Sequence, residues 1–191
     1  MKIVHIFAPE GGAEKGEGLW AVEYEGKEMN EFEMLVRLWD DSIYMYAFCS
    51  EHLSDVREKF GYEIDAVTAA AELKEEAEEL VQYLNQLGTR GLAGANLQYV
   101  FKPLDNTQST ITELQLSKGA FNNRTGRVPK LRIYAVRIDK NTYVVTGGAI
   151  KLTHRMQDRP HTDEQLHRLR TVRDWLKEQG IYYSEDLTNL L

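Results

Sequence analysis

The chain has 191 residues, of which 42% are hydrophobic and 28% are charged, values typical of a folded globular protein of one or two domains. No stretch approaches the ~18 apolar residues of a membrane-spanning helix, and the N-terminus lacks the features of a signal peptide. We therefore expect a cytoplasmic protein without a membrane segment. The single cysteine, Cys49, excludes an internal disulfide and a multi-cysteine zinc site.

Charge divides the chain into two halves. Residues 1–100 hold 8 Lys and Arg against 20 Asp and Glu, whereas residues 101–191 hold 15 against 10. Between Lys118 and Lys177, 14 basic residues face 5 acidic ones. This asymmetry favours contact between the second half and nucleic acid or phosphate. The same charges are also compatible with docking on the acidic half, or with an ordinary solvated surface.

The first half is predicted to contain two strands and three helices. The strands cover residues 2–8 and 19–24, and the glycine-rich stretch between them is too long for a tight turn. Asn30 and Glu33 have the spacing of a capping box, which marks a helix start. Apolar residues at helical spacing, opposite a glutamate-rich solvated face, identify the longest helix. The predicted helices cover residues 31–40, 42–52 and 66–87.

The second half is predicted to be richer in strands. Three successive strands without helices between them favour an antiparallel meander, with the neighbouring helices on one face and the basic residues on the other. The fold class is therefore α+β. The strands are expected at residues 110–116, 131–138 and 142–152, a basic loop at 118–129, a hairpin connection at 139–141, and a final helix at 163–179.

Motifs of the common catalytic classes are missing from the sequence. It has no phosphate-binding glycine loop of standard spacing, no HExxH zinc motif and no G-x-S-x-G element. Carboxylates are few in the basic half, which disfavours metal-dependent nuclease chemistry. We therefore expect neither a metal nor a cofactor.

The basic half instead gathers side chains that suit phosphate binding. Arg132 and Tyr134 share one face of a predicted strand, while Lys151 and His154 follow the next strand. Together with basic residues nearby in the sequence, they could form a phosphate pocket. The RNA-contacting candidates are Lys118, Arg124, Arg127, Lys130 and Arg155.

Such a pocket can cleave RNA without a metal. The ribose 2′-hydroxyl attacks the neighbouring phosphate, Arg and Lys stabilise charge on the phosphoryl oxygens, and a His, Lys or Tyr relays protons. Arg132, Lys151, Tyr134 and His154 are the catalytic candidates. Tyr134 could instead stack on a base, and Arg132 and Tyr134 could equally be plain surface residues.

The run KLRIYAVRIDKNTYVVTGGAIKLTHRM, followed by a basic helix, resembles the RelE/HigB-like toxin superfamily and is closest to its phage-derived branch. Upstream, FKPLDN and ITELQL resemble the "KPL" turn and the "lwELR" strand of that family. The resemblance extends over residues 66–179. The matching residues are Arg132, Ile133 and Tyr134 in the block "yRIlY", and Gly148, Ile150, Lys151 and Thr153, followed by Pro160, in the block "hGFxKKTqktP".

The resemblance implies a RelE-like antiparallel sheet packed with helices over residues 63–191, preceded by an acidic α/β extension over residues 1–62. It implies a toxin of a bacterial type II toxin–antitoxin system that cleaves mRNA on the ribosome without a metal. Its partner would be a small antitoxin protein. Carried across by position, Arg132 and Lys151 would contact phosphate.

Two positions depart from the family pattern. Gln115 stands where the family strand has Arg, and Gly147 stands where it has His. A second hypothesis is therefore a non-catalytic module that binds nucleic acid or protein for a phage or mobile element, with the acidic N-terminal segment masking the basic face. A third is a structural protein of a mobile element, in which the charges serve only solubility.

Overall fold

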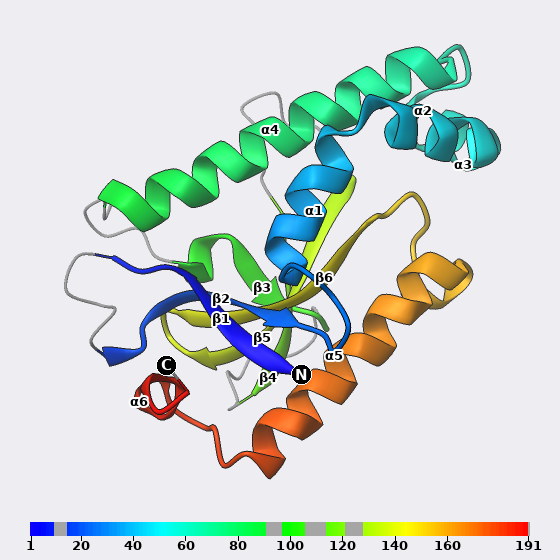
Figure 1. Cartoon of the computed structure of the whole chain (residues 1–191). Coiled ribbons are helices and arrows are strands. Elements are labelled where there is room, and N and C mark those ends of the chain that lie inside the picture. Colours follow the sequence, from blue (N-terminus) through cyan, green and yellow to red (C-terminus); the bar gives the residue numbers. More distant parts are fainter. Residues whose placement is uncertain (10–14, 91–96, 106–113, 121–127, 191) are drawn as a thin grey trace.

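A computed structural model describes residues 1–9, 15–90, 97–105, 114–120 and 128–190. This part of the chain is a mixed α+β structure (Figure 1). Its strands are β1 (Lys2–Phe7), β2 (Gly18–Glu23), β3 (Phe101–Pro103), β4 (Gln115–Gly119), β5 (Leu131–Asp139) and β6 (Thr142–Ile150). Its helices are α1 (Glu31–Asp40), α2 (Ser42–Glu51), α3 (Leu53–Phe60), α4 (Ala66–Arg90), α5 (Pro160–Glu178) and α6 (Ser184–Thr188), with 3-10 turns at Leu97–Tyr99 and Met156–Asp158.

The six strands form one sheet in the order β1-β2-β6-β5-β4-β3. The β4-β5-β6 meander is antiparallel, as predicted. The sheet as a whole is mixed rather than antiparallel, because β2 runs parallel to β6. Parallel neighbours require a long crossover, and here the chain passes through α1–α4 and three further strands before β6 pairs with β2.

Helices cover both faces of the sheet (Figure 1). Leu73 and Leu80 of α4 are buried in a core that also contains residues of α1 and α2. Leu169 and Val172 of α5 are buried in a second core on the opposite face. The prediction that helices cover one face only was therefore wrong, because the apolar stripe of α5 needs a sheet face of its own.

The acidic first 62 residues contribute to the same sheet and to both cores. They supply β1 and β2 at one sheet edge, Trp39 to the core beneath α4 and Trp20 to the core beneath α5. The Tyr24 hydroxyl donates a hydrogen bond to the carbonyl of Thr146, at 2.9 Å. The two halves of the chain therefore share one sheet and both of the hydrophobic cores that pack on it.

Helix starts follow local capping chemistry. The Asn30 side chain accepts a hydrogen bond from the Glu33 N–H at 3.0 Å, as the capping pattern predicted. α5 begins at Pro160, three residues before the predicted start, because proline is well suited to the first helical turn. Three short elements, α3, β3 and α6, lie outside the predicted set. Among the described residues, none of the helices has the length and apolar character needed to cross a membrane.

β4 lies later in the chain than predicted. The alternation pattern predicts a strand at residues 110–116 and a loop from 118, but the observed strand continues through Lys118 to Gly119. Gly119 marks a close approach rather than a turn, since a Cβ there would lie 2.7 Å from the ring of Phe101. Residues 110–113 and 121–127 of these two predictions lie outside the described structure.

Candidate functional site

A pocket of about 730 Å³ is bordered by β4, β5, α5 and the segment that follows β6. Of its described lining residues, eight are Lys or Arg, and one, Asp105, is acidic. Like charges gathered in a concave surface focus the field on counter-ions, so this cationic pocket attracts anions although the whole chain carries a net charge of −7. Its basic residues are Lys59, Lys118, Arg132, Lys151, Arg155, Arg170, Arg173 and Lys177.

Strand geometry brings the inner residues of the cationic pocket together. Side chains two positions apart on a strand share a face, which places Arg132 and Tyr134 side by side on β5. In the antiparallel register Lys118 of β4 lies directly opposite Tyr134. Lys151 follows β6, and its N–H donates to the carbonyl of Lys130 at 2.7 Å, which extends the β5–β6 pairing by one residue.

Lys151 is held in place by backbone carbonyls. Its Nζ donates hydrogen bonds to the carbonyl oxygens of Thr153 and His154, both at 2.5 Å. Burial lowers the pKa of Lys151, and the positive charges of Arg132 and Lys59 lower it further. The side chain is therefore a fixed cation whose charge is disfavoured by burial and by the neighbouring cations, and an anion would relieve that repulsion.

Lys118 and Arg132 share this unfavourable environment. The Nζ of Lys118 donates to the carbonyl of Leu104 at 3.0 Å, and burial together with Arg132 lowers the pKa of Lys118. Burial also lowers the pKa of Arg132, while the negative charge of Glu76 opposes that shift. A cluster of partly desolvated cations is a recognised sign of a binding site, since it costs stability without a ligand.

Tyr134 is the most deeply placed polar residue of the cationic pocket. Its side chain is 1% exposed, and its Oη has no hydrogen-bond partner among the described residues. Burial raises the pKa of Tyr134 to about 12, so the phenol stays protonated at neutral pH. A buried hydroxyl without a hydrogen-bond partner is energetically costly.

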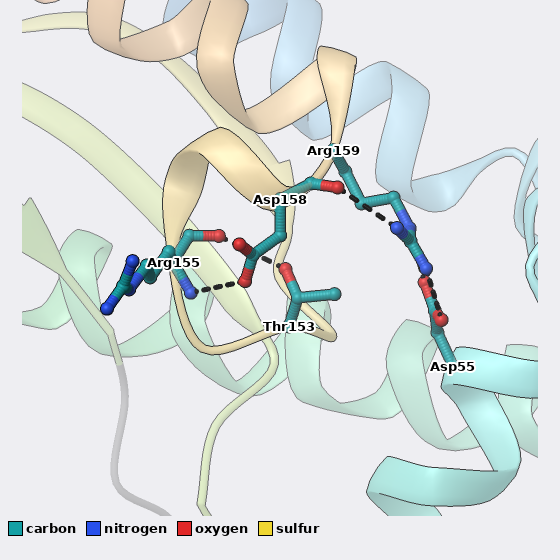
Figure 2. Close-up of polar contacts among 5 residues, drawn as sticks. All are labelled: Asp55, Thr153, Arg155, Asp158 and Arg159. Carbon is teal, nitrogen blue, oxygen red and sulfur yellow. Dashed lines mark hydrogen bonds and ion pairs between the residues drawn. The ribbon is translucent and has the colours of Figure 1, made fainter.

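The segment after β6 is fixed by a chain of polar contacts (Figure 2). The Thr153 hydroxyl donates to the Arg155 carbonyl at 3.1 Å, and the Arg155 N–H donates to Asp158 Oδ2 at 2.8 Å. The Arg159 guanidinium donates to both carboxylate oxygens of Asp55, at 2.6 and 2.7 Å. Helix α3 therefore anchors the wall that carries His154 and Arg155.

Six of the predicted site residues meet in the cationic pocket, namely Lys118, Arg132, Tyr134, Lys151, His154 and Arg155. Lys130 is not among the lining residues: it is 7% exposed, and its Nζ lies 4.1 Å from the ring centroid of Phe60. The structure therefore does not bring Lys130 together with the other candidates, and its position on a basic stretch did not reveal this cation–π packing. Arg124 and Arg127 lie outside the described residues.

Four basic residues of the cationic pocket were missed by the sequence analysis. Lys59 comes from α3 in the acidic half, and no local pattern connects it with β5. Arg170, Arg173 and Lys177 come from α5, and their spacing of three and four residues, which places them on one helix face, was an available signal. The net charge of α5 does not reveal this basic row, because the helix also carries acidic residues.

Comparison of the chain with known protein families, curated proteins and solved structures identified no relative. No family model matches the chain, and no curated protein or solved structure was found to be similar to it. Among the described residues, no group of three or more His, Cys, Asp and Glu side chains is arranged to hold a metal ion.

Proposed function

We propose that this protein is a metal-independent endoribonuclease of the RelE/HigB-like toxin kind, which cleaves mRNA bound to the ribosome. The observation that carries the proposal is the convergence of Lys118, Arg132, Tyr134 and Lys151 in one recessed pocket. These residues come from three different strands or strand ends, and three of them, Arg132, Tyr134 and Lys151, match the family blocks quoted above. The cationic pocket supplies charge stabilisation without a metal.

The chemistry follows from the placement of these groups. The ribose 2′-oxygen forms a bond to the adjacent phosphorus, and the bond from phosphorus to the 5′-oxygen breaks. Arg132 and Lys151 contact the phosphoryl oxygens, where negative charge develops, and Tyr134 donates a hydrogen bond to them. His154, which is exposed, carries the proton from the 2′-hydroxyl to the departing 5′-oxygen.

An antitoxin protein is the partner that this proposal requires. A nuclease that acts on cellular mRNA must be neutralised during normal growth, and a partner that presents carboxylates to the cationic pocket would block RNA entry. The proposal also places the protein at the ribosome, where mRNA is exposed as a single strand.

The deciding experiment induces the chain alone in a bacterium and maps new RNA 5′ ends in translated messages. We expect growth arrest and discrete cuts with the unaltered chain, and a loss of cleavage of about 100-fold or more in Arg132→Ala and Lys151→Ala. Lys140→Ala is the control, since Lys140 is exposed and does not line the cationic pocket. Cleavage that persists in both pocket variants rejects the proposal.

A second candidate function is RNA binding without cleavage, controlled by an acidic rim. A pocket of about 520 Å³ shares Lys59 and His154 with the cationic pocket and is also lined by Asp55, Glu58 and Asp158. Acidic residues of α3 therefore border the cationic pocket. Intact messages together with tighter RNA binding by Glu58→Gln would favour this candidate over the nuclease.

A further inference from the structure

Three basic residues of α5 form a row on one side of that helix. At 100° per residue, Arg170, Arg173 and Lys177 fall within an arc of about 60°. The row lies beside the buried stripe of Leu169, Val172 and Leu176, so it stands at the edge where α5 meets the sheet. All three side chains line the cationic pocket.

The three α5 residues and the inner cations, Lys118 and Arg132, line different walls of the cationic pocket. Lys118 and Arg132 come from the sheet, whereas the row comes from the helix that packs on it. Arg173 is ion-paired with its neighbour Asp174 at 2.9 Å. The side chains of Arg170 and Lys177 are exposed and form no hydrogen bond or ion pair with a described residue.

The cationic pocket is larger than one phosphate requires. Its volume of about 730 Å³ lies in the upper part of the range of pockets that hold drug-sized ligands. From Arg170 to Lys177 the helix rises about 10 Å, so the row adds a second group of cations along the pocket. A positively charged groove of this kind follows the backbone of a single nucleic-acid strand.

We propose that α5 provides a second phosphate subsite, in which Arg170 and Lys177 bind the phosphate next to the one held by the sheet residues. The ligand is then a single-stranded polynucleotide that spans the cationic pocket between sheet and helix. This inference rests on the proposed function for the identity of the ligand as RNA, and it concerns binding rather than the chemical step.

The test compares two double variants that remove the same charge. Arg170→Ala/Lys177→Ala changes the α5 row, and Lys27→Ala/Lys140→Ala removes two exposed lysines that do not line the cationic pocket. Binding to the full chain is measured by fluorescence anisotropy with labelled 2′-O-methyl oligoribonucleotides, which have no 2′-hydroxyl and are not cleaved. One probe is a dinucleotide with one phosphodiester, and the other is a hexanucleotide.

We expect the salt dependence of hexanucleotide binding to separate the variants. Each phosphate neutralised on a single strand contributes about 0.7 to the slope of log K against log salt. The slope should therefore fall by about 0.7 in the α5 variant, because Arg170 and Lys177 share one phosphate, and stay unchanged in the control variant. Dinucleotide affinity should be the same in the two double variants, because the inner subsite is intact in both.

Three outcomes bear on the inference. Equal hexanucleotide slopes in the two double variants overturn it, and so does an equal loss of dinucleotide and hexanucleotide affinity in the α5 variant. RNA cleavage that depends on Lys151, together with equal slopes, rejects the α5 subsite and keeps the nuclease. A slope difference without cleavage by the unaltered chain keeps the subsite and rejects the nuclease.

Discussion

The guanidinium of Arg159 donates two hydrogen bonds, 2.6 and 2.7 Å long, to the carboxylate of Asp55, which lies 104 residues earlier in the chain. Asp55 lies on α3, and Arg159 immediately precedes α5. Arg159 also donates to the carbonyl of Asp158 at 3.0 Å. The pair therefore links the acidic half of the chain to the pocket wall that carries His154 and Arg155.

Breaking this pair should loosen that wall. We expect Asp55→Ala to lower the free energy of unfolding by about 2 kcal/mol, the scale for hydrogen bonds to a charged partner, and to weaken RNA cleavage as well. Urea denaturation and single-turnover cleavage assays measure the two effects. Asp40→Ala breaks an exposed pair with Lys74 and is the control, with an expected loss below about 1 kcal/mol.

A reversed pair distinguishes positioning from simple loss of charge. Asp55→Arg/Arg159→Asp restores opposite charges in the same place, so it should recover part of the cleavage that Asp55→Ala loses. If the reversed pair restores stability and leaves cleavage at the level of Asp55→Ala, the pair has no role in positioning the wall.

Tyr134→Phe should raise stability and lower function. Its Oη is buried without a partner among the described residues, so its removal should stabilise the protein by about 1 kcal/mol, or about 3 °C in Tm for a chain of this size. RNA binding and cleavage should weaken, because the donor to the phosphoryl oxygen is gone. The control is Tyr24→Phe, which loses a hydrogen bond to Thr146 and should destabilise. Lower Tm with unchanged cleavage in Tyr134→Phe would contradict the assignment.

Gly147 should not tolerate a side chain. Its φ of +154° is strained for other residues, and a Cβ would lie 2.1 Å from Oε1 of the buried Gln165. We expect Gly147→Ala to cost more than about 1 kcal/mol in the free energy of unfolding. Gly26→Ala is the matched control, because Gly26 also has a positive φ but open space around it. Equal losses in the two variants would show that contact with Gln165 is unimportant.

Stability should fall as the pH drops below the ordinary histidine pKa, partly because of His161. Burial lowers the pKa of His161 below its ordinary value of 6.5, so between the folded-state pKa and 6.5 the unfolded chain binds more protons than the folded one. Stability is therefore lost as the pH falls through that interval. His161→Gln, whose amide can still donate to the Ile150 carbonyl, should show a smaller change in urea midpoint between pH 7 and pH 5.5. An unchanged profile would exclude His161 as the source.

Periodic elements of the fold were predictable from the sequence, and elements fixed by distant contacts were not. The 66–87 pattern predicted most of α4, and the β5–β6 hairpin lies where its turn residues indicated. No local sequence pattern indicates the parallel pairing of β2 with β6. This pairing depends on which edge of the sheet is free once the β4-β5-β6 meander has formed. β4 was misplaced because residues 118–129 were interpreted as a polar, basic loop, whereas Lys118 and Gly119 belong to the strand.

The site was predictable only where its residues lie close together in sequence. Arg132, Tyr134 and Lys151 are close in the chain and share a strand face or a strand end, so alternation was enough to group them. Lys59 joins them solely through the packing of α3 against the segment after β6. Lys130 has the right charge but packs on Phe60, and side-chain direction of this kind is set by tertiary contacts.

The parallel β2–β6 pair also has a consequence for the order of events during synthesis. Tyr24 and its partner Thr146 are 122 positions apart, so the first strands leave the ribosome long before the strand that completes their pairing exists. Contacts of such long range form late in folding, and an unpaired apolar strand is prone to aggregate in the meantime. The strong negative charge of the first hundred residues keeps nascent chains apart during this delay. The cationic pocket is complete only after β6 and α5 have been synthesised, because it is lined by residues that follow β6 and by residues of α5.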